Sequence, residues 1–178
     1  MINYLVLCLT EAKSLSVKET LSTTKRAANI WQEVEMKIRK IEHLGIAVKD
    51  IEKGVSFYRD ALGLSVPAVT RDEAMGATIA FVNIGESSLE LISPLEEPPP
   101  GSTGDVMRKF ITNKGEGIHH LCVAVDNIEA ALKELEQKGI TLIDKVPRPG
   151  AHGKVAFVHP KSTNGVLLEL CQPEHHSS

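Results

Sequence analysis

The sequence predicts an α+β fold in which two tandem βαβββ modules form one domain with a cleft lined by their sheets. The main observation is an internal repeat, because the segment IEHLGIAV at residues 41–48 returns 77 positions later as IHHLCVAV at residues 118–125. The second observation is that each copy continues into an apolar stripe at helical spacing and then into short β-like segments. Since a module of about 55 residues is marginal by itself, the two copies should pack together and hold a site between them.

Each repeat is followed by a predicted helix. The first helix is opened by Asp50 as its N-cap and closed by Gly63. The second is opened by Asp126, with Glu129 three residues later, and closed by Gly139. Their apolar stripes are Ile51, Val55, Tyr58 and Leu62 in the first helix and Ile128, Ala131, Leu132 and Leu135 in the second.

Three β-like segments follow each helix. They are predicted at residues 64–70, 78–84 and 89–93 in the first copy and at 141–146, 155–159 and 166–171 in the second. The modules then span about residues 41–95 and 118–172 within one domain at 39–174. The linker at 96–117 holds a proline run and a short helical pattern of apolar residues.

Residues 1–38 form a predicted N-terminal extension, because they have no strand signal that could pair with either copy. Within residues 1–30, the basic residues Lys13, Lys18, Lys25 and Arg26 outnumber Glu11 and Glu19. This excess favours a targeting segment and a place in the mitochondrial matrix. The alternative is a disordered tail on a cytoplasmic protein.

The composition excludes several classes of function. Twenty Lys and Arg against 23 Asp and Glu give a net charge of −3, which does not suggest a nucleic-acid partner. The longest apolar run near the start, residues 2–9, is far shorter than the roughly 20 residues that span a bilayer, so no membrane partner is expected. The cysteines Cys8, Cys122 and Cys171 form no CxxC pair, which argues against a disulfide framework and against redox chemistry.

Equivalent positions of the two copies carry a histidine. Because side chains alternate across a strand, His43 shares a face with the small residues Gly45 and Ala47, opposite the large apolar residues. In the second copy the same register selects His120, and it places the neighbouring His119 on the other face of the strand. The large apolar face should pack on the helices, which leaves the histidine face free for a ligand.

The last strand of each copy supplies a matching carboxylate. Glu90 lies in SLELI and Glu169 lies in LLELC, each between leucines. A carboxylate among such neighbours is costly to bury unless it is paired or binds a metal. Two imidazoles and two carboxylates that converge would form an open site for Co, Ni, Zn, Mn or Fe(II) rather than for calcium. The alternative is that the four side chains are separate, solvated positions.

Six motifs then carry a resemblance to a known family. They are HLGIAV at 43–48, FYRDALG at 57–63, LELISPL at 89–95, GIHHLCVAVDNI at 117–128, GAHGK at 150–154 and HPKSTNGVLLEL at 159–170. The sequence resembles the vicinal oxygen chelate superfamily and, within it, the epimerase family that acts on methylmalonyl-CoA. The resemblance covers nearly all of residues 40–173. It places His43, His120 and Glu169 on the family's metal ligands and Glu90 on a fourth ligand position.

The resemblance implies a metal-dependent epimerase that interconverts (2R)- and (2S)-methylmalonyl-CoA in propionyl-CoA and branched-chain amino acid breakdown. It also implies one divalent metal ion, with Co²⁺ preferred over Mn²⁺, Ni²⁺ or Zn²⁺, and a homodimer. Glu169 is the expected proton-transfer base. Some members carry a second glutamate on the third strand, where this sequence has Ile79, and Glu73 lies just before that strand. Lys154 and Lys161 are candidates for the substrate's anionic groups.

Two alternatives remain open on the sequence alone. One is a glyoxalase I-like lyase of the same superfamily, which also uses four ligands. An extradiol dioxygenase is less suitable, because Glu90 would crowd the open metal positions that oxygen chemistry needs. The other alternative is a metal-free protein that binds a small molecule on the same fold, although the retention of all four ligand positions argues against it.

Overall fold

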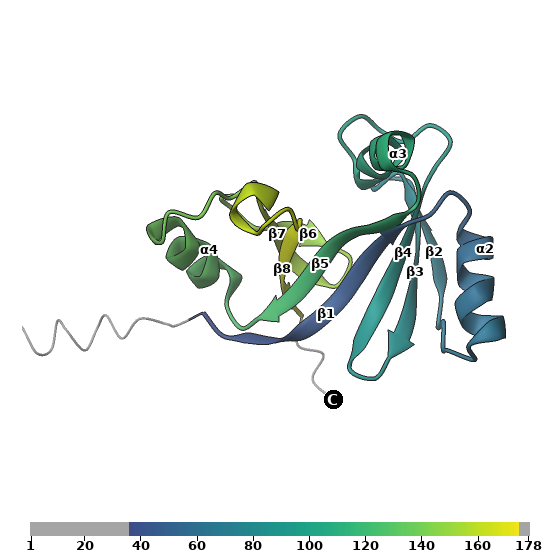
Figure 1. The fold of residues 1–178 in the computed structure, drawn as a ribbon, viewed down its shortest axis with the longest axis horizontal. Helices are drawn as coiled ribbons and strands as arrows, with labels where there is room; N and C mark the ends of the chain where they lie inside the picture. Colours follow the sequence, from purple (N-terminus) through teal and green to yellow (C-terminus); the bar gives the residue numbers. More distant parts are fainter. Residues whose placement is uncertain (1–35, 175–178) are drawn as a thin grey trace, which may run out of the picture. The chain divides into compact units, whose positions relative to one another are not determined.

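The computed structural model describes residues 36–174. The predicted N-terminal extension therefore lies outside the described residues except for its last three positions. The elements, labelled as in Figure 1, are β1 (Ile38–Ala47), α2 (Ile51–Ser56), the π-helical turn η1 (Phe57–Ala61), β2 (Val69–Asp72), β3 (Ala77–Ile84), β4 (Ser87–Pro94), α3 (Thr103–Lys114), β5 (Gly117–Val125), α4 (Ile128–Gln137), β6 (Arg148–Gly150), β7 (Gly153–Val158), the 3₁₀ turn η2 (Pro160–Ser162) and β8 (Leu168–Pro173). Within residues 36–174, none of the helices has the length and apolar character that crossing a membrane requires.

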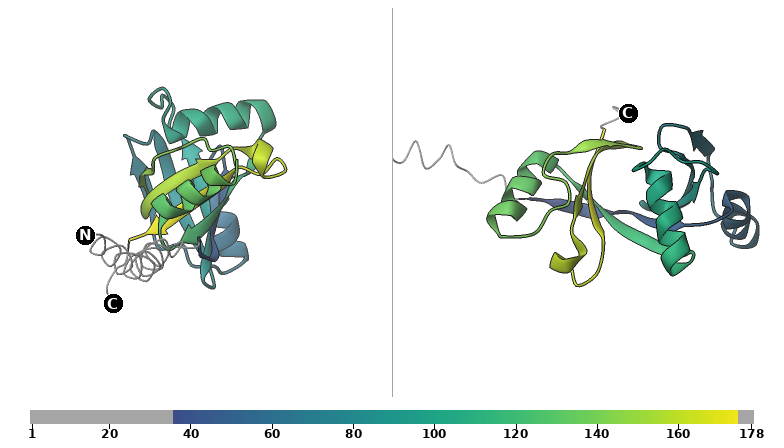
Figure 2. Two further views of the ribbon diagram at one scale, coloured as in Figure 1. Left: turned by 90° about the vertical axis from the view of Figure 1, so that its left-hand side faces the viewer. Right: turned by 90° about the horizontal axis from the view of Figure 1, so that it is seen from above.

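All eight described strands form one sheet in the order β2-β3-β4-β1-β5-β8-β7-β6. The central pair, β1 and β5, is antiparallel, and each of these strands pairs in parallel with the last strand of its own module, β4 or β8. The two halves of the sheet therefore repeat the same strand order on either side of the β1–β5 pair, related by a pseudo-twofold axis (Figures 1 and 2). This arrangement confirms the α+β fold of two βαβββ modules.

The helices divide between the two faces of the sheet. Helices α2 and α4 cover the face that carries the large apolar residues of β1 and β5, as the alternation predicts. The core under α2 includes Val48, Val55, Ala80, Val82 and Leu91, and the core under α4 includes Val123, Val125, Ile128, Leu132 and Leu170. Helix α3, from the predicted linker, packs on the opposite face, where Met107 belongs to one core cluster with Ala47, Ile79 and Ile92. One end of the histidine-bearing face is therefore covered by α3.

The sheet curls strongly around the histidine-bearing face. In the sheet order β3 and β7 are five strand spacings apart, which would be about 24 Å in a flat sheet. Yet the ring of Phe81 on β3 lies 4.4 Å, centroid to centroid, from the ring of His152 in the turn between β6 and β7. The histidine-bearing face is therefore the inner surface of the curved sheet.

Three local predictions were wrong. The strand predicted at 64–70 is reduced to one bridge between Ser65 and Asn83, and β2 begins only at Val69. Helix α4 is capped by Asn127, whose side chain accepts a hydrogen bond from the Ala130 N–H, while Asp126 forms an ion pair with Arg39. Asn127 lies 77 positions after Asp50, the observed cap of α2, so the repeat itself marked the correct residue. The strand predicted at 141–146 is reduced to one bridge between Leu142 and Val158, and the pairing resumes only in β6.

Candidate metal centre

The two histidines face each other across the central strand pair. In the β1–β5 register His43 lies opposite Cys122, and His120 lies opposite Gly45. The two pairs are equivalent, because Gly45 lies two residues after His43 and Cys122 lies two residues after His120. The inward alternation of both strands therefore brings the two Nε2 atoms within 3.2 Å of each other. Both side chains are buried, with 8% and 4% of their surface exposed.

The two glutamates come from the strands next to the central pair. Glu90 on β4 lies opposite Gly45 of β1, and Glu169 on β8 lies opposite Cys122 of β5. Each glutamate therefore lies beside the residue that comes two positions after the histidine of its own module. Both glutamates are 6% exposed. The fold brings all four sequence-predicted residues together from four different strands.

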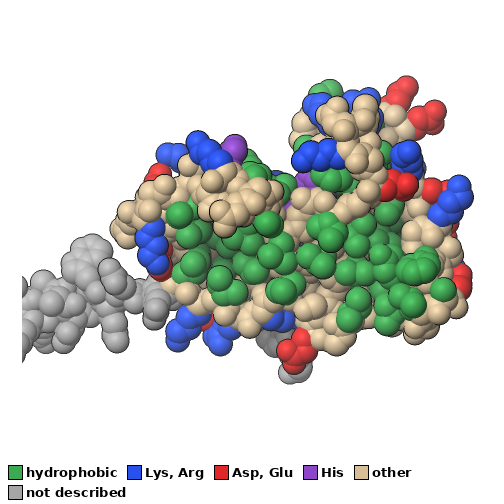
Figure 3. All heavy atoms as spheres, in the orientation of Figure 1, with side chains coloured by type: hydrophobic (Ala, Val, Ile, Leu, Met, Phe, Trp, Pro, Cys, Tyr) green, Lys and Arg blue, Asp and Glu red, His purple; other side chains and the backbone are tan. Residues whose placement is uncertain are grey.

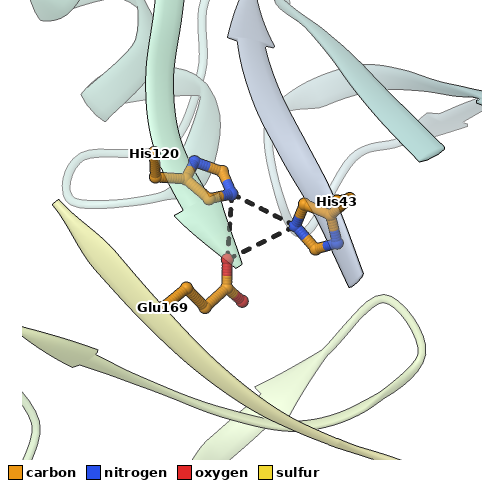
Figure 4. A group of neighbouring side chains, drawn as sticks. All are labelled: His43, His120 and Glu169. Atoms are coloured by element: carbon orange, nitrogen blue, oxygen red, sulfur yellow. Dashed lines mark hydrogen bonds and ion pairs between the residues drawn. The ribbon is translucent and has the colours of Figure 1, made fainter. Parts of the chain in front are cut away.

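The separations between the polar atoms are short on every side. Glu169 Oε2 lies 2.9 Å from Nε2 of His120 and 3.5 Å from Nε2 of His43. Glu90 Oε2 lies 3.3 Å from Nε2 of His43 and 3.6 Å from Nε2 of His120. Figure 4 shows His43, His120 and Glu169 directed at a common point from β1, β5 and β8. One donor atom of each of these three residues lies within 4.8 Å of the others.

This donor set fits a divalent metal ion. Ligand atoms at about 2.1 Å from one ion stand about 3.0 to 3.4 Å apart at adjacent positions. The separations among His43, His120 and Glu169, 3.2, 3.5 and 2.9 Å, are close to that range. Imidazole nitrogen and carboxylate oxygen are borderline and hard donors that suit Zn, Co, Ni, Mn or Fe(II). The structure therefore contains a possible His–His–Glu metal site with a second carboxylate beside it.

The electrostatics of the cluster are dominated by the histidine–carboxylate contacts. Burial lowers the pKa of His120, but the hydrogen bonds and negative charges of Glu169 and Glu90 outweigh burial and raise this pKa to about 9. Burial raises the pKa of Glu169, but the hydrogen bonds from His120 and His43 outweigh burial and lower this pKa to about 2. In the metal-free protein a proton on the imidazole therefore balances part of the buried negative charge.

Small and aromatic neighbours fix the two imidazole rings. A Cβ atom on Gly45 would lie 2.0 Å from Cε1 of His120, so only glycine leaves room for that ring. Phe81 lies opposite Glu90 on the neighbouring strand, and Phe157 lies opposite Glu169 in the equivalent position. The Phe81 ring meets His43 edge-on at 6.1 Å, and the Phe157 ring meets His120 at 5.7 Å. The two phenylalanines form apolar walls on equivalent sides of the cluster.

The position of His119 differs from the prediction. It was expected on the opposite face from His120, but its Nδ1 lies 3.0 Å from Nδ1 of His120. The cause is a β-bulge, because Gly45 pairs with His120 while Ile46 pairs with Ile118, which leaves His119 as the extra residue. Burial, and after it the positive charge of His120, lower the pKa of His119 to about 4. Regular alternation cannot reveal this bulge, because it arises from pairing with β1.

Other candidate residues lie outside the cluster. Glu73 is exposed and forms a 2.7 Å ion pair with Arg71. Lys154 forms a 2.5 Å ion pair with Glu129 on α4. Among residues that the sequence did not single out, Arg148 on β6 places its guanidinium 5.2 Å from the centroid of Phe157.

The two described cysteines line the inner face as small buried residues. Cys122 and Cys171 pack with Ala124 and Val155. The hydrogen bond with Cys171 and then burial raise the pKa of the Cys122 thiol well above its usual range. A thiol with a raised pKa is a poor nucleophile, so Cys122 serves here as a small buried residue.

A family profile and individual relatives both match this chain over most of its length. The profile of the Glyoxalase/Bleomycin resistance protein/Dioxygenase superfamily matches residues 42–157. The mitochondrial methylmalonyl-CoA epimerase of Mus musculus is 43% identical over 164 residues, which cover 89% of this chain and 86% of the relative. The ethylmalonyl-CoA/methylmalonyl-CoA epimerase of Cereibacter sphaeroides is 38% identical over 137 residues, which cover 76% of this chain and 98% of the relative.

A solved structure of a methylmalonyl-CoA epimerase in complex with methylmalonyl-CoA and NH4+ aligns with a TM-score of 0.68 at 30% identity, and the alignment covers 78% of this chain and 96% of that one. The chain therefore belongs to the Glyoxalase/Bleomycin resistance protein/Dioxygenase superfamily, in the group that contains the methylmalonyl-CoA epimerases.

Proposed function

We propose that the protein is a methylmalonyl-CoA epimerase, which interconverts the (2R) and (2S) forms of its substrate in propionyl-CoA and branched-chain amino acid breakdown. The observation that supports this most strongly is the pair of buried glutamates on equivalent strands, each in contact with the same two imidazoles. The similarity to epimerases named for this substrate supports the same conclusion.

The reaction requires removal of the hydrogen at C2, between a thioester and a carboxylate. Its removal places negative charge on the thioester oxygen, and return of a proton to the other face of the enolate inverts the centre. A divalent ion held by His43, His120 and Glu169, with Glu90 as a fourth ligand, would stabilise this charge as a Lewis acid. We propose Co²⁺ as that ion, with Mn²⁺, Ni²⁺ or Zn²⁺ as alternatives, since all suit nitrogen and oxygen donors.

Glu169 is the proposed base on one face of the enolate. Its carboxylate is buried and lies 2.9 Å from Nε2 of His120 and 3.5 Å from Nε2 of His43, beside the point where the metal would hold the substrate and a base must reach the C2 hydrogen. For the other face, Ile79 offers no proton acceptor and Glu73 is exposed. Glu90 is the other buried glutamate among residues 36–174, and it occupies the position equivalent to Glu169. We therefore propose Glu90 for the second proton transfer.

The decisive experiment follows the C2 hydrogen by proton NMR in deuterium oxide. The wild-type protein should exchange this hydrogen in both epimers of methylmalonyl-CoA. The Glu169→Gln and Glu90→Gln variants keep an oxygen donor but lose the basic carboxylate. Each should lose epimerisation by at least ~100-fold, while one epimer, different for the two variants, still exchanges. Wild-type protein that carries metal but exchanges neither epimer would refute the proposed function, and formation of lactoylglutathione would favour the lyase instead.

Near-normal exchange of both epimers by the Glu90→Gln variant would show that Glu90 acts only as a metal ligand.

The anionic parts of the substrate need a cation near the cluster. Arg148 is our candidate, because its guanidinium lies 5.2 Å from the ring of Phe157, which walls the cluster. Its ion pair with Asp144, at 3.6 Å, is also looser than the 2.5 Å pair of Lys154 with Glu129. The Arg148→Gln variant should raise KM more than it lowers kcat, because the guanidinium would bind substrate without taking part in proton transfer.

We also propose a homodimer located in mitochondria. The central strands expose the large apolar residues Ile38, Ile41 and Ile118, and Figure 3 shows apolar side chains over both halves of the sheet on the face turned to the viewer. Analytical ultracentrifugation tests the dimer. The excess of basic residues in positions 1–30 and the mitochondrial relatives support the location, which a fluorescent fusion of segment 1–38 tests.

A further inference from the structure

We infer that His119 is a positioning residue that accepts a hydrogen bond from Nδ1–H of His120 and thereby directs Nε2 of His120 at the metal ion. This inference rests on the proposed metal centre and extends it to a residue that ligates nothing. It begins with the contact between the two rings, whose Nδ1 atoms lie 3.0 Å apart.

The direction of this hydrogen bond follows from the role of Nε2, the second ring nitrogen of His120, as the proposed metal-binding atom. Nε2 is the atom that lies 2.9 Å from Glu169 and 3.2 Å from Nε2 of His43. A neutral imidazole that ligates through Nε2 carries its proton on Nδ1. Nδ1 of His120 is then the donor and Nδ1 of His119 is the acceptor. Partners of this kind fix the orientation and tautomer of metal-binding histidines and increase their basicity.

The β-bulge in β5 makes the contact between the His119 and His120 rings possible. In a regular strand the side chains of residues 119 and 120 would point to opposite faces. The extra residue in β5 turns both rings to one side, with 5.2 Å between their centroids. The other side of the His119 ring is closed by Phe110 of α3, which it meets edge-on at 5.0 Å. The His119 ring is therefore held between His120, the proposed metal ligand, and helix α3, which covers this end of the inner face.

The equivalent position in the first module carries a different residue. The β1 strand has a bulge of its own between Ile41 and His43, and its extra residue, Glu42, lies 77 positions before His119. The Glu42 carboxylate pairs with Lys40 at 3.2 Å. Both modules thus have a bulge just before the metal-binding histidine. Only in the second module is the extra residue a histidine, and it contacts the neighbouring ligand, His120.

Two substitutions separate hydrogen bonding from packing. His119→Phe keeps an aromatic ring against Phe110 but has no acceptor. His119→Asn loses the ring but places Oδ1 near the position of Nδ1. If His119 acts as an acceptor, His119→Phe should bind Co²⁺ and Zn²⁺ about 10- to 100-fold more weakly and show an altered visible Co²⁺ spectrum. His119→Asn should stay within about threefold of the wild type. Calorimetry and chelator competition measure these affinities.

The opposite ranking, or equal affinity for all three proteins, would overturn the inference, as would equal weakening of both variants. Nitrogen-15 NMR of the Zn²⁺-loaded wild type tests it without any substitution. We expect a proton on Nδ1 of His120 and none on Nδ1 of His119, and the reverse assignment would overturn the inference. Wild-type protein that binds metal but does not exchange the C2 hydrogen would refute the proposed function and leave this inference in place.

Discussion

Replacement of Gly45 by alanine should disable the metal centre while the fold persists. The added Cβ would lie 2.0 Å from Cε1, 2.3 Å from Nδ1 and 2.5 Å from Nε2 of His120. Ordinary contact begins at 3.4 Å, so the ring must retreat by about 3.4 − 2.0 = 1.4 Å. Metal–ligand distances tolerate only about 0.2 Å. We therefore expect a loss of at least ~100-fold in metal affinity and in C2 hydrogen exchange.

The Gly45→Ala variant should stay folded but lose stability. Gly45 is in an ordinary strand conformation, but displacement of the buried His120 ring should cost about 1–3 kcal/mol. Gly54→Ala on α2 is the matched control, since its Cβ would meet Leu91 at 3.4 Å and Val48 at 3.5 Å. Calorimetric titration with Co²⁺ and thermal unfolding measure both quantities. A Gly45→Ala protein with wild-type metal affinity would show that the ring position does not govern the site.

Three further predictions follow from the same structure. Chelation of the metal should leave the circular dichroism spectrum nearly unchanged, because the cores under α2 and α4 lie on the other face of the sheet, and a spectrum of an unfolded chain would contradict this. His120→Ala should weaken metal binding by at least ~100-fold in equilibrium dialysis, more than any substitution of its neighbour, because a ligand is removed. Asp105→Asn should lower Tm at pH 7, because hydrogen bonds from Lys109, Gly101 and Arg108 hold the pKa of Asp105 below its ordinary value of 3.8. A lowered folded-state pKa stabilises above the unfolded value, so the Tm difference should shrink as pH falls below about 4, and a constant difference would refute this.

The internal repeat made much of the fold and the candidate site predictable. Equivalent positions in two copies selected His43, His120, Glu90 and Glu169 without any knowledge of how the strands pair. The orientation of β1 and β5 also followed from simple alternation, because Ile46 packs in the core under α2, and Leu121, Val123 and Val125 pack in the core under α4.

What the sequence could not predict depends on contacts between distant segments. The bulge at His119 exists only because β5 pairs with β1 in a shifted register. Helix α3 looked like a linker, since its short apolar pattern gives no sign of which sheet face it covers. The role of Gly45 is invisible in one strand, because it depends on the ring that lies opposite.

A duplicated fold is well suited to the proposed chemistry. Epimerisation needs one proton acceptor on each face of a planar enolate, and a pseudo-twofold axis supplies two carboxylates around one point by construction. The donors are equivalent in position, but their surroundings differ, since Gly45 faces one imidazole where Cys122 faces the other. Glu169 also lies closer to its imidazole, at 2.9 Å, than Glu90 does, at 3.3 Å. The two proton transfers should therefore differ in rate, because their carboxylates differ in hydrogen bonding although the fold places them alike.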